Sequence, residues 1–549
     1  MRLTALLFFL VPFHIFATSS PPAALESMEK ELDFIQYHME VNYAPAEWKY
    51  THSGWDLATK IEEAKADLRA APNLSFSYYH QTLRRFFDST HDYHVKAFFS
   101  ASGIAYLPLE LLKAGNRYFV VSTLIPEIDA GDEVVACDGV SMETVIERLV
   151  QRRSGIRSES DYAEAIREFS LRNAAEGVAL PDEDEVILSL LSKRTGSPYQ
   201  TKVEWIKIEE EMPGYRSPLV KAASPSIPNI LMMRGLDALR PQRANTPFAL
   251  GSRTSYLPPL GDVVKQLESP SFDAYIFKDP RGRKIGYLRI ATYSPEEDTA
   301  AEDFQRLINQ MERETHALVI DQINNPGGYV THLYGLLSML TDRPLYVPSQ
   351  TFYVTPDFAK TSVLVARALE EIFVMGTEQD IEEILGFESF GFPLLPEHYA
   401  DVYDFFKMVG DEWAAGNRVL PSIYLYGISK IPPHPKGRYS KPIVVLINEQ
   451  DYSSADFFPA ILQDNKRATL FGVKTAGAGG AIGVNALNSP YGVVAFSSTF
   501  SLAHRLDGQV IEDLGVTPDV VHELTVNDIQ YNFVDYRRDL MKTLNSLLK

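Results

Sequence analysis

The sequence predicts a multidomain α/β protein, and three observations support this fold class. The chain has 549 residues, enough for three or four domains of ordinary size. Apolar residues make up 45% of it and charged residues 23%, which is typical of a globular protein. From residue 284 onward, short β-branched apolar runs alternate with segments of helical period, as in an α/β layer architecture.

Residues 1–17 are interpreted as a secretory signal peptide. Arg2 precedes a short apolar stretch that ends at the small residue Ala17. The stretch is shorter than a comfortable membrane span, and an uncleaved anchor is the alternative. We therefore expect export to the periplasm or beyond, into a host cell, without stable membrane insertion.

The net charge and the cysteine content argue against several kinds of function and bonding. The formal net charge of −20 disfavours nonspecific binding to nucleic acid or to an anionic membrane. Cys137 is the single cysteine, so an intramolecular disulfide is excluded, and its surroundings predict a buried position in a strand. No metal or organic cofactor is implied.

The N-terminal region, residues 18–103, is predicted to be helical. Apolar residues recur at helical spacing at Leu57, Ile61, Ala64 and Leu68, with charged residues between them. Residues 76–87 continue this pattern.

Residues 104–223 are expected to form a separate small domain. A strand is predicted over 117–122, a turn, strand and Asp-Gly hairpin over 128–140, and a helix over 143–150. This order resembles a PDZ domain, a module that binds extended peptide ends by strand addition. An ordinary α+β unit is the alternative.

Residues 224–283 are rich in Pro, Gly, Ser and Arg and are predicted to be an exposed connector. Residues 284–549 are predicted to form the α/β core, interrupted by an insertion at about 344–438. Within the core, strands are expected at 285–290, 317–321, 442–447 and 468–473, and helices at 298–313 and 330–340.

Ser453 is the first candidate for chemistry. It lies between the apolar run 442–447 and a helical segment that contains Phe457, Phe458, Ile461 and Leu462. A serine on a turn between strand and helix is how several hydrolases present a nucleophile. The alternative is that Ser453 caps the helix, because serine is a preferred N-cap residue.

Three further segments could assist a nucleophilic serine. Gly327 and Gly328 follow the predicted strand 317–321, where a backbone N–H could closely approach a substrate oxygen or simply serve a structural turn. His94 is one of twelve histidines that could act as the base, and chemistry alone does not select it. Its spacing to His91 could also suit a metal, but no third ligand of matching pattern lies nearby.

Glu512 could complete a triad by orienting and stabilising the base. The alternative is a surface acidic residue in a turn, because glutamate is mostly exposed.

Together these motifs resemble the tail-specific and carboxyl-terminal processing proteases, the clan that includes the tricorn core. The phrase Ser453-Ser-Ala-Asp456 matches the clan's pattern and indicates Ser453 rather than Ser454 as the nucleophile, and 324–328 and 515–519 match two further phrases. Many of these proteases use a lysine base 25 residues after the serine, where this chain has Ala478. A Ser–Lys mechanism is therefore not expected, and the base must come from elsewhere.

A closer resemblance is to the chlamydial protease-like activity factors, secreted serine proteases with a Ser–His–Glu triad. It rests on the phrases around Asp92-Tyr-His94, Asn448, Ser453, Lys474 and Glu512. The resemblance implies Ser453 as nucleophile, His94 as base and Glu512 as the orienting carboxylate. It also implies an oxyanion hole formed by the N–H of Ser454 and of Gly327 or Gly328.

The resemblance further implies a zymogen whose internal segment, matched here by the connector, is cut out in trans, and an active homodimer of processed chains. Protein substrates, in particular host proteins, would be the partners. Two other functions stay open, a periplasmic protease that processes C-termini and a non-catalytic ligand carrier of the same fold.

Overall fold

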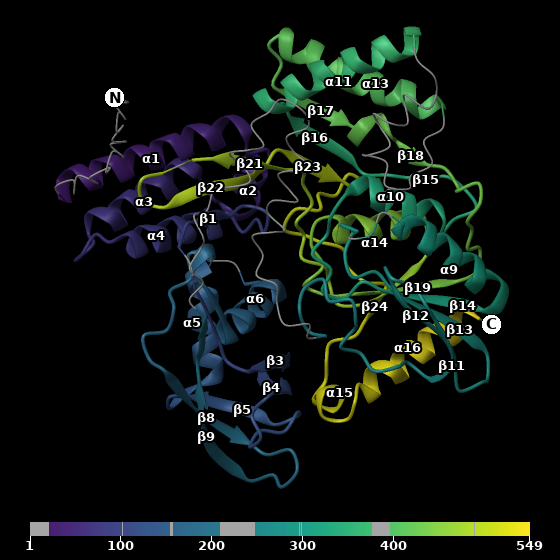
Figure 1. Cartoon of the computed structure of the whole chain (residues 1–549), viewed down its shortest axis with the longest axis horizontal. Helices are drawn as coiled ribbons and strands as arrows, with labels where there is room; N and C mark the ends of the chain where they lie inside the picture. The colour runs from purple at the N-terminus through teal and green to yellow at the C-terminus, as the bar shows by residue number, and fades with distance from the viewer. Residues whose placement is uncertain are drawn as a thin grey trace, which may run out of the picture.

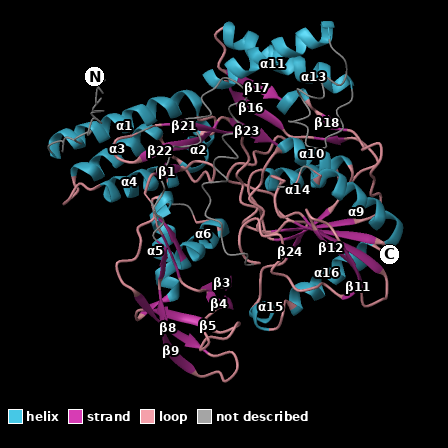
Figure 2. Ribbon diagram, in the orientation of Figure 1, coloured by secondary structure: helices cyan, strands magenta, loops and turns pink. Residues whose placement is uncertain are grey.

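The computed structural model describes residues 21–101, 103–153, 157–208, 247–295, 297, 299–375, 396–487 and 489–548. The predicted signal peptide and residues 224–246 of the predicted connector lie outside the described residues. The expected fold class is confirmed, since helices at the N-terminus precede a β domain and an α/β core (Figure 1). Figure 2 shows the strands of the β domain below the N-terminal helices and apart from the core sheet.

Four helices form the N-terminal region: α1 (Pro21–Asn42), α2 (Ala46–Ser53), α3 (Leu57–Arg69) and α4 (Phe76–Asp88). Their apolar faces pack together, and Ile61 of α3 is fully buried, as its helical spacing predicted. Asp56 caps α3 by accepting a hydrogen bond from Thr59 N at 2.8 Å. The region is not helical throughout, because β1 (Ala97–Phe99) pairs with β22 (Val493–Thr499) of the core. A three-residue strand whose partner lies almost 400 positions away leaves no local signal.

The second domain is built on a sheet with strand order β3-β4-β5-β8-β9, in which β6 pairs with β5, and a small sheet of order β10-β2-β7. The helix α6 packs along β3. Cys137 is buried in β5, and Asp138 and Gly139 form the predicted turn to β6. The elements are β2 (Ile104–Tyr106), β3 (Leu109–Ala114), β4 (Arg117–Thr123), β5 (Glu133–Cys137), β6 (Val140–Ser141), α5 (Met142–Arg153), α6 (Glu159–Ser170), β7 (Leu171–Asn173), η1 (Ala174–Glu176), β8 (Glu185–Leu191), β9 (Pro198–Glu204) and β10 (Ile206–Ile208).

The core is a seven-stranded sheet of order β11-β12-β13-β14-β19-β20-β24, parallel from β13 onward. Two of its strands, β11 (Asp262–Leu267) and β12 (Asp273–Lys278), lie where the sequence predicted connector up to residue 283, and that prediction is wrong there. The buried Ile276 and Phe277 explain why this segment joins the core. The remaining strands are β13 (Lys284–Arg289), β14 (Ala317–Asp321), β19 (Ile443–Ile447), β20 (Thr469–Gly472) and β24 (Val520–Val521).

Helices cover both faces of this sheet. The helices α9 (Ala300–Glu314), α10 (Val330–Ser338) and α14 (Ser454–Asp464) pack on one face, and α16 (Val534–Leu547) packs on the other (Figure 1). A short helix, α15 (Val526–Gln530), precedes α16. Such a layered arrangement buries the central strands on both sides, which explains their unbroken apolar runs.

The insertion contributes a layer of its own next to the core. Its strand β16 (Ser349–Tyr353) pairs with β17 (Val419–Ile423) and with β23 (Ser501–His504), and the helices α11 (Pro356–Met375) and α13 (Pro396–Ala414) pack together over them. The other elements of the insertion are β15 (Leu345–Tyr346), η2 (Leu425–Gly427) and β18 (Lys430–Ile431). The strand β21 (Ile482–Ala486) lies outside the insertion and pairs with β22.

The sheet determines where the sequence motifs meet. The neighbouring strands β14 and β19 are parallel, so their carboxyl ends lie at the same edge, with Asp321 opposite Leu446. The glycine-containing loop 322–328 and the turn that carries Ser453 therefore emerge side by side, at the edge where open α/β sheets bind ligands. Among the described residues, no helix combines the length and apolarity that a membrane crossing needs.

Replacing Phe304 by Ala should lower the free energy of unfolding by about 3–5 kcal/mol, because its ring is fully buried between α9 and the sheet. Urea denaturation would measure this change. Phe34→Ala is the control, since that ring is 48% exposed and should cost far less. Equal losses in the two variants would contradict the assigned core.

Candidate active site

Ser453 stands on a strained turn between β19 and α14. Its backbone has φ 61° and ψ −120°, a conformation that non-glycine residues rarely adopt. It occupies the N-cap position of α14, but its side chain makes no capping hydrogen bond. The hydroxyl is therefore not used to stabilise the helix. Backbone strain of this kind typically costs about 1–3 kcal/mol and is concentrated at functional sites.

Buried polar groups hold the turn in place. Asp451 accepts hydrogen bonds from Asn325 N, Asn448 N and Gln322 Nε2 at 3.1, 3.0 and 2.9 Å. Burial raises the pKa of the Asp451 carboxyl, and these three donors act in the opposite direction. This side chain ties the loop after β14 to the turn after β19.

A proline in α14 allows a further hydrogen bond between this helix and the loop that follows β14. Pro459 has no N–H to donate to the carbonyl of Ala455, and that oxygen instead accepts a hydrogen bond from Gln322 Nε2 at 2.7 Å. Gln322 in turn accepts from the Tyr293 hydroxyl at 2.9 Å. The proline thus leaves an acceptor for a side chain from the neighbouring strand end.

The glycine loop lies directly against the serine. A Cβ on Gly327 would lie 2.6 Å from Ser453 Cβ, and one on Gly328 would lie 2.2 Å from the carbonyl carbon of Tyr293. Gly327 N donates to Asn325 Oδ1 at 2.8 Å, whereas Ser454 Oγ donates to the Gly328 carbonyl at 2.8 Å. Among the described residues, the N–H groups of Gly328 and Ser454 have no acceptor within the protein.

Asp456, one turn into α14, fixes the loop that contains Ala478. Its buried carboxylate accepts from Thr475 Oγ1, Gly477 N and Ala478 N at 2.5, 2.9 and 3.0 Å. Burial raises the pKa of Asp456 to about 6 against the effect of these donors. Ala478 is itself fully buried, while Lys474 is exposed and lines a cavity. The position of the expected lysine base is thus filled by a methyl group.

His94 is joined to β22 of the core by a hydrogen bond. Its carbonyl accepts from Ser497 Oγ at 2.5 Å, and its N–H donates to Asp92 Oδ1 at 2.9 Å. The ring of the preceding Tyr93 packs against the ring of Tyr452, with centroids 5.3 Å apart. The structure therefore brings the neighbours of His94 and Ser453 into contact, although the two residues are 359 positions apart in the sequence.

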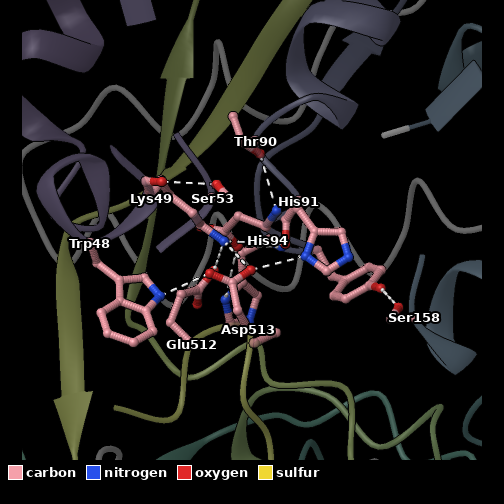
Figure 3. A network of polar contacts seen from close by, with 12 residues as sticks. Trp48, Lys49, Ser53, Thr90, His91, His94, Ser158, Glu512 and Asp513 are labelled. Atoms are coloured by element: carbon pink, nitrogen blue, oxygen red, sulfur yellow. Dashed lines mark hydrogen bonds and ion pairs between the residues drawn. The ribbon is translucent and has the colours of Figure 1, made fainter. Parts of the chain in front are cut away.

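Glu512 is buried near His94, with 1% of its surface exposed. Figure 3 shows both side chains beside Asp513 and Lys49. Lys49 Nζ lies 2.6 Å from Glu512 Oε1, and the two side chains form a buried ion pair. Within the described residues, no direct hydrogen bond joins Glu512 to His94. Because Glu512 is buried, the alternative of a surface glutamate is excluded.

His91 links three parts of the chain. Its Nδ1 lies 2.9 Å from Asp513 Oδ1 and its Nε2 lies 3.0 Å from Asp161 Oδ2 of α6. Burial disfavours the charged ring, but these two carboxylates outweigh it and raise the pKa of His91 to about 9. Both nitrogens are thus engaged as donors of a cationic imidazolium, which suits neither a general base nor a metal ligand.

The sequence reasoning missed four residues around the site, namely Lys49, Trp48, Asp513 and Asp161. Asp513 accepts from Trp48 Nε1 at 2.8 Å and from Lys49 Nζ at 2.7 Å. Lys49 lies on α2, where a lysine in a short helix gives no sign of burial. Only the folded structure, which places α2 against the loop of Glu512, identifies it.

A cavity of about 1000 Å³ lies between the second domain and the core. The strand β3 and the helix α6 line one side, and residues 447–450 and 472–474 line the other. Because 448–450 lead directly into the turn of Ser453, the cavity adjoins the site.

Replacing Gly327 by Ala should destabilise the protein by roughly 2–4 kcal/mol, because the new methyl group would meet Ser453 and Tyr452 at a φ of 90°. Gly139→Ala is the matched control. Its φ is 76° with nothing within 4 Å, so only about 1–2 kcal/mol of backbone strain is expected. Urea unfolding of both variants tests this, and equal losses would contradict the close packing at Ser453.

The ionised His91 predicts a pH dependence of stability. Because its folded pKa of about 9 exceeds the ordinary 6.5, its contribution is complete below pH 6.5 and is lost as the pH rises through 9. The loss should be roughly 3 kcal/mol, at about 1.4 kcal/mol for each unit of pKa. Unfolding free energies of wild type and His91→Asn across this range provide the measurement. A slope that persists unchanged in the variant would refute the assignment.

Comparisons with known proteins agree with this geometry. Residues 284–522 match the model of peptidase family S41, and residues 104–212 match a PDZ domain. A Chlamydia pneumoniae protein is 32% identical over 97% of this chain and 92% of its own length, and a Chlamydia trachomatis protein is 33% identical over 94% and 92%.

Among solved structures, mature CPAF (chlamydial protease-like activity factor) in complex with lactacystin superposes with a TM-score of 0.83 and 32% identity. The match covers 96% of this chain and 99% of that one. The resemblance inferred from the sequence is thereby confirmed, as is the PDZ-like domain. The chain belongs to peptidase family S41 as a CPAF-like serine peptidase.

Proposed function

We propose that this peptidase is an endopeptidase that cleaves proteins through an acyl-enzyme intermediate on Ser453. The observation that carries the proposal is the strained turn of Ser453, whose hydroxyl does not cap α14 and which lies against the glycine loop. The presence of a serine, a histidine and a buried carboxylate in this region disfavours a non-catalytic ligand carrier.

In the first step, the Ser453 hydroxyl attacks the scissile carbonyl while His94 accepts its proton. Negative charge develops on the carbonyl oxygen. The N–H groups of Ser454 and Gly328 are the donors for it, because neither has an acceptor within the described protein. Gly327 is less suited, since its N–H is already given to Asn325. The start of α14 adds a favourable dipole at this point.

The intermediate then collapses as His94 returns the proton to the leaving amine, and a water activated by the same ring hydrolyses the acyl-enzyme. Glu512 stabilises the transient imidazolium. Hydrogen bonds between catalytic groups are often long in the free enzyme and shorten when substrate binds. The absence of a hydrogen bond between the described residues Glu512 and His94 in the free protein is consistent with this behaviour.

We further propose that the protein is exported as a zymogen, removes part of 224–283 in trans, and acts as a homodimer on host proteins. The signal-like residues 1–17 and the similarity to a structure described as mature support this. Because β11 and β12 belong to the core sheet, the removable segment should end before residue 262.

Replacing Ser453 by Ala should lower kcat for an unstructured protein substrate by about 10⁴-fold or more, since the nucleophile is lost. It should also stop self-cleavage, while added active enzyme should still cut the variant in trans. Gel analysis and kinetic assays measure both effects. Ser77→Ala, at an exposed position on α4, is the control. Undiminished self-cleavage by pure Ser453→Ala protein would disprove the proposal.

A further inference from the structure

The buried charges around Glu512 are unequal in number. Glu512 and Asp513 both pair with Lys49, and Asp92 contributes a further carboxylate close by. Asp513 has other donors, namely Trp48 Nε1 at 2.8 Å and His91 Nδ1 at 2.9 Å. For Glu512, within the described residues, the ion pair with Lys49 is the one such contact.

Glu512 and Lys49 are both sealed from water, with exposures of 1% and 0%. A buried carboxylate next to another carboxylate tends to take up a proton unless a cation opposes this. Burial and Asp92 raise the pKa of Glu512, whereas Lys49 lowers it. The Lys49 ammonium is itself kept charged, because Glu512 and Asp513 raise its pKa against the effect of burial.

We propose that Lys49 is a positioning residue for catalysis, and that its ammonium sets the charge and the aim of the Glu512 carboxylate toward His94. A protonated Glu512 could not stabilise the imidazolium that forms at His94 during acylation. The groups that face Glu512 are Lys49 and Tyr43 from the N-terminal region, Asp92 and His94 after α4, and Asp513 of its own loop.

The proposal predicts in which direction each substitution shifts the pH profile of kcat. Loss of Lys49 removes the cation that favours the ionised Glu512, so the acidic limb of kcat should move to higher pH. Asp92→Asn should move it to lower pH, because the repulsion falls while the asparagine oxygen can still accept from His94 N. The inference rests on the proposed function, since it needs Ser453-dependent cleavage by the wild type.

The experiment compares kcat and KM from pH 5 to 10 for the full-length wild type, Lys49→Met and Asp92→Asn. For Lys49→Met we expect an alkaline shift of roughly 1 to 3 pH units with an unchanged KM. Should that variant not fold, Lys49→Met combined with Asp513→Asn removes one buried carboxylate together with the cation. An alkaline shift is again expected, but a smaller one, because Asp513 also raises the pKa of Glu512.

Glu512→Gln is the matched background for Lys49→Met. In it, the shift caused by Lys49→Met should disappear, because Glu512 is the group through which Lys49 acts. Asp92→Asn can still act there directly, since Asp92 Oδ1 lies 4.0 Å from His94 Nδ1. A Lys49→Met shift that persists in the Glu512→Gln background would overturn the proposal, as would a pH-independent loss of kcat in Lys49→Met. If wild-type cleavage did not depend on Ser453, the proposed function itself would fail, which is a separate outcome.

Discussion

The carboxylate of Asp513 is the point at which three parts of the chain are held together. Trp48 and Lys49 of α2 bind it from the N-terminal helices, and His91 connects it to Asp161 of the PDZ domain. Asp513 belongs to the core loop that also carries Glu512. Because the side chains of Lys49, His91, Asp161 and Asp513 are almost fully buried, their charges interact with little screening by water. The placement of Glu512 beside the segment that carries His94 therefore depends on this cluster as much as on the core sheet.

The turn that carries Ser453 is held by a second set of contacts. Asp451, Gln322 and Asn325 link the ends of β14 and β19, and Asp456 links α14 to the loop of Ala478. Asp513 N donates to the Gly477 carbonyl at 2.9 Å, which connects this second set to the first. The backbone strain at Ser453 is thus offset by a network of buried hydrogen bonds, as expected where a turn must present a reactive side chain.

Much of the core fold and the position of the Ser453 turn could be predicted from local sequence patterns. The core strands 317–321 and 443–447 are continuous apolar runs, and the serine turn and the glycine loop follow them directly, so their proximity follows from a parallel sheet. The family resemblance, rather than any pattern, indicated His94 and Glu512. Strands β11 and β12 were missed because Pro- and Gly-rich segments surround them. Lys49 and His91 could not be recognised, because a buried charge is identified only by partners that lie far away in sequence.

The central claim is that Ser453 is a nucleophile activated by His94. The most direct measurement is labelling of the intact protein with a fluorophosphonate probe, followed by mass spectrometry of its peptides. The account predicts one adduct, on Ser453, that forms at a rate strongly reduced in His94→Ala protein of unchanged fold. An adduct on another residue, or labelling of Ser453 at the same rate without His94, would contradict it.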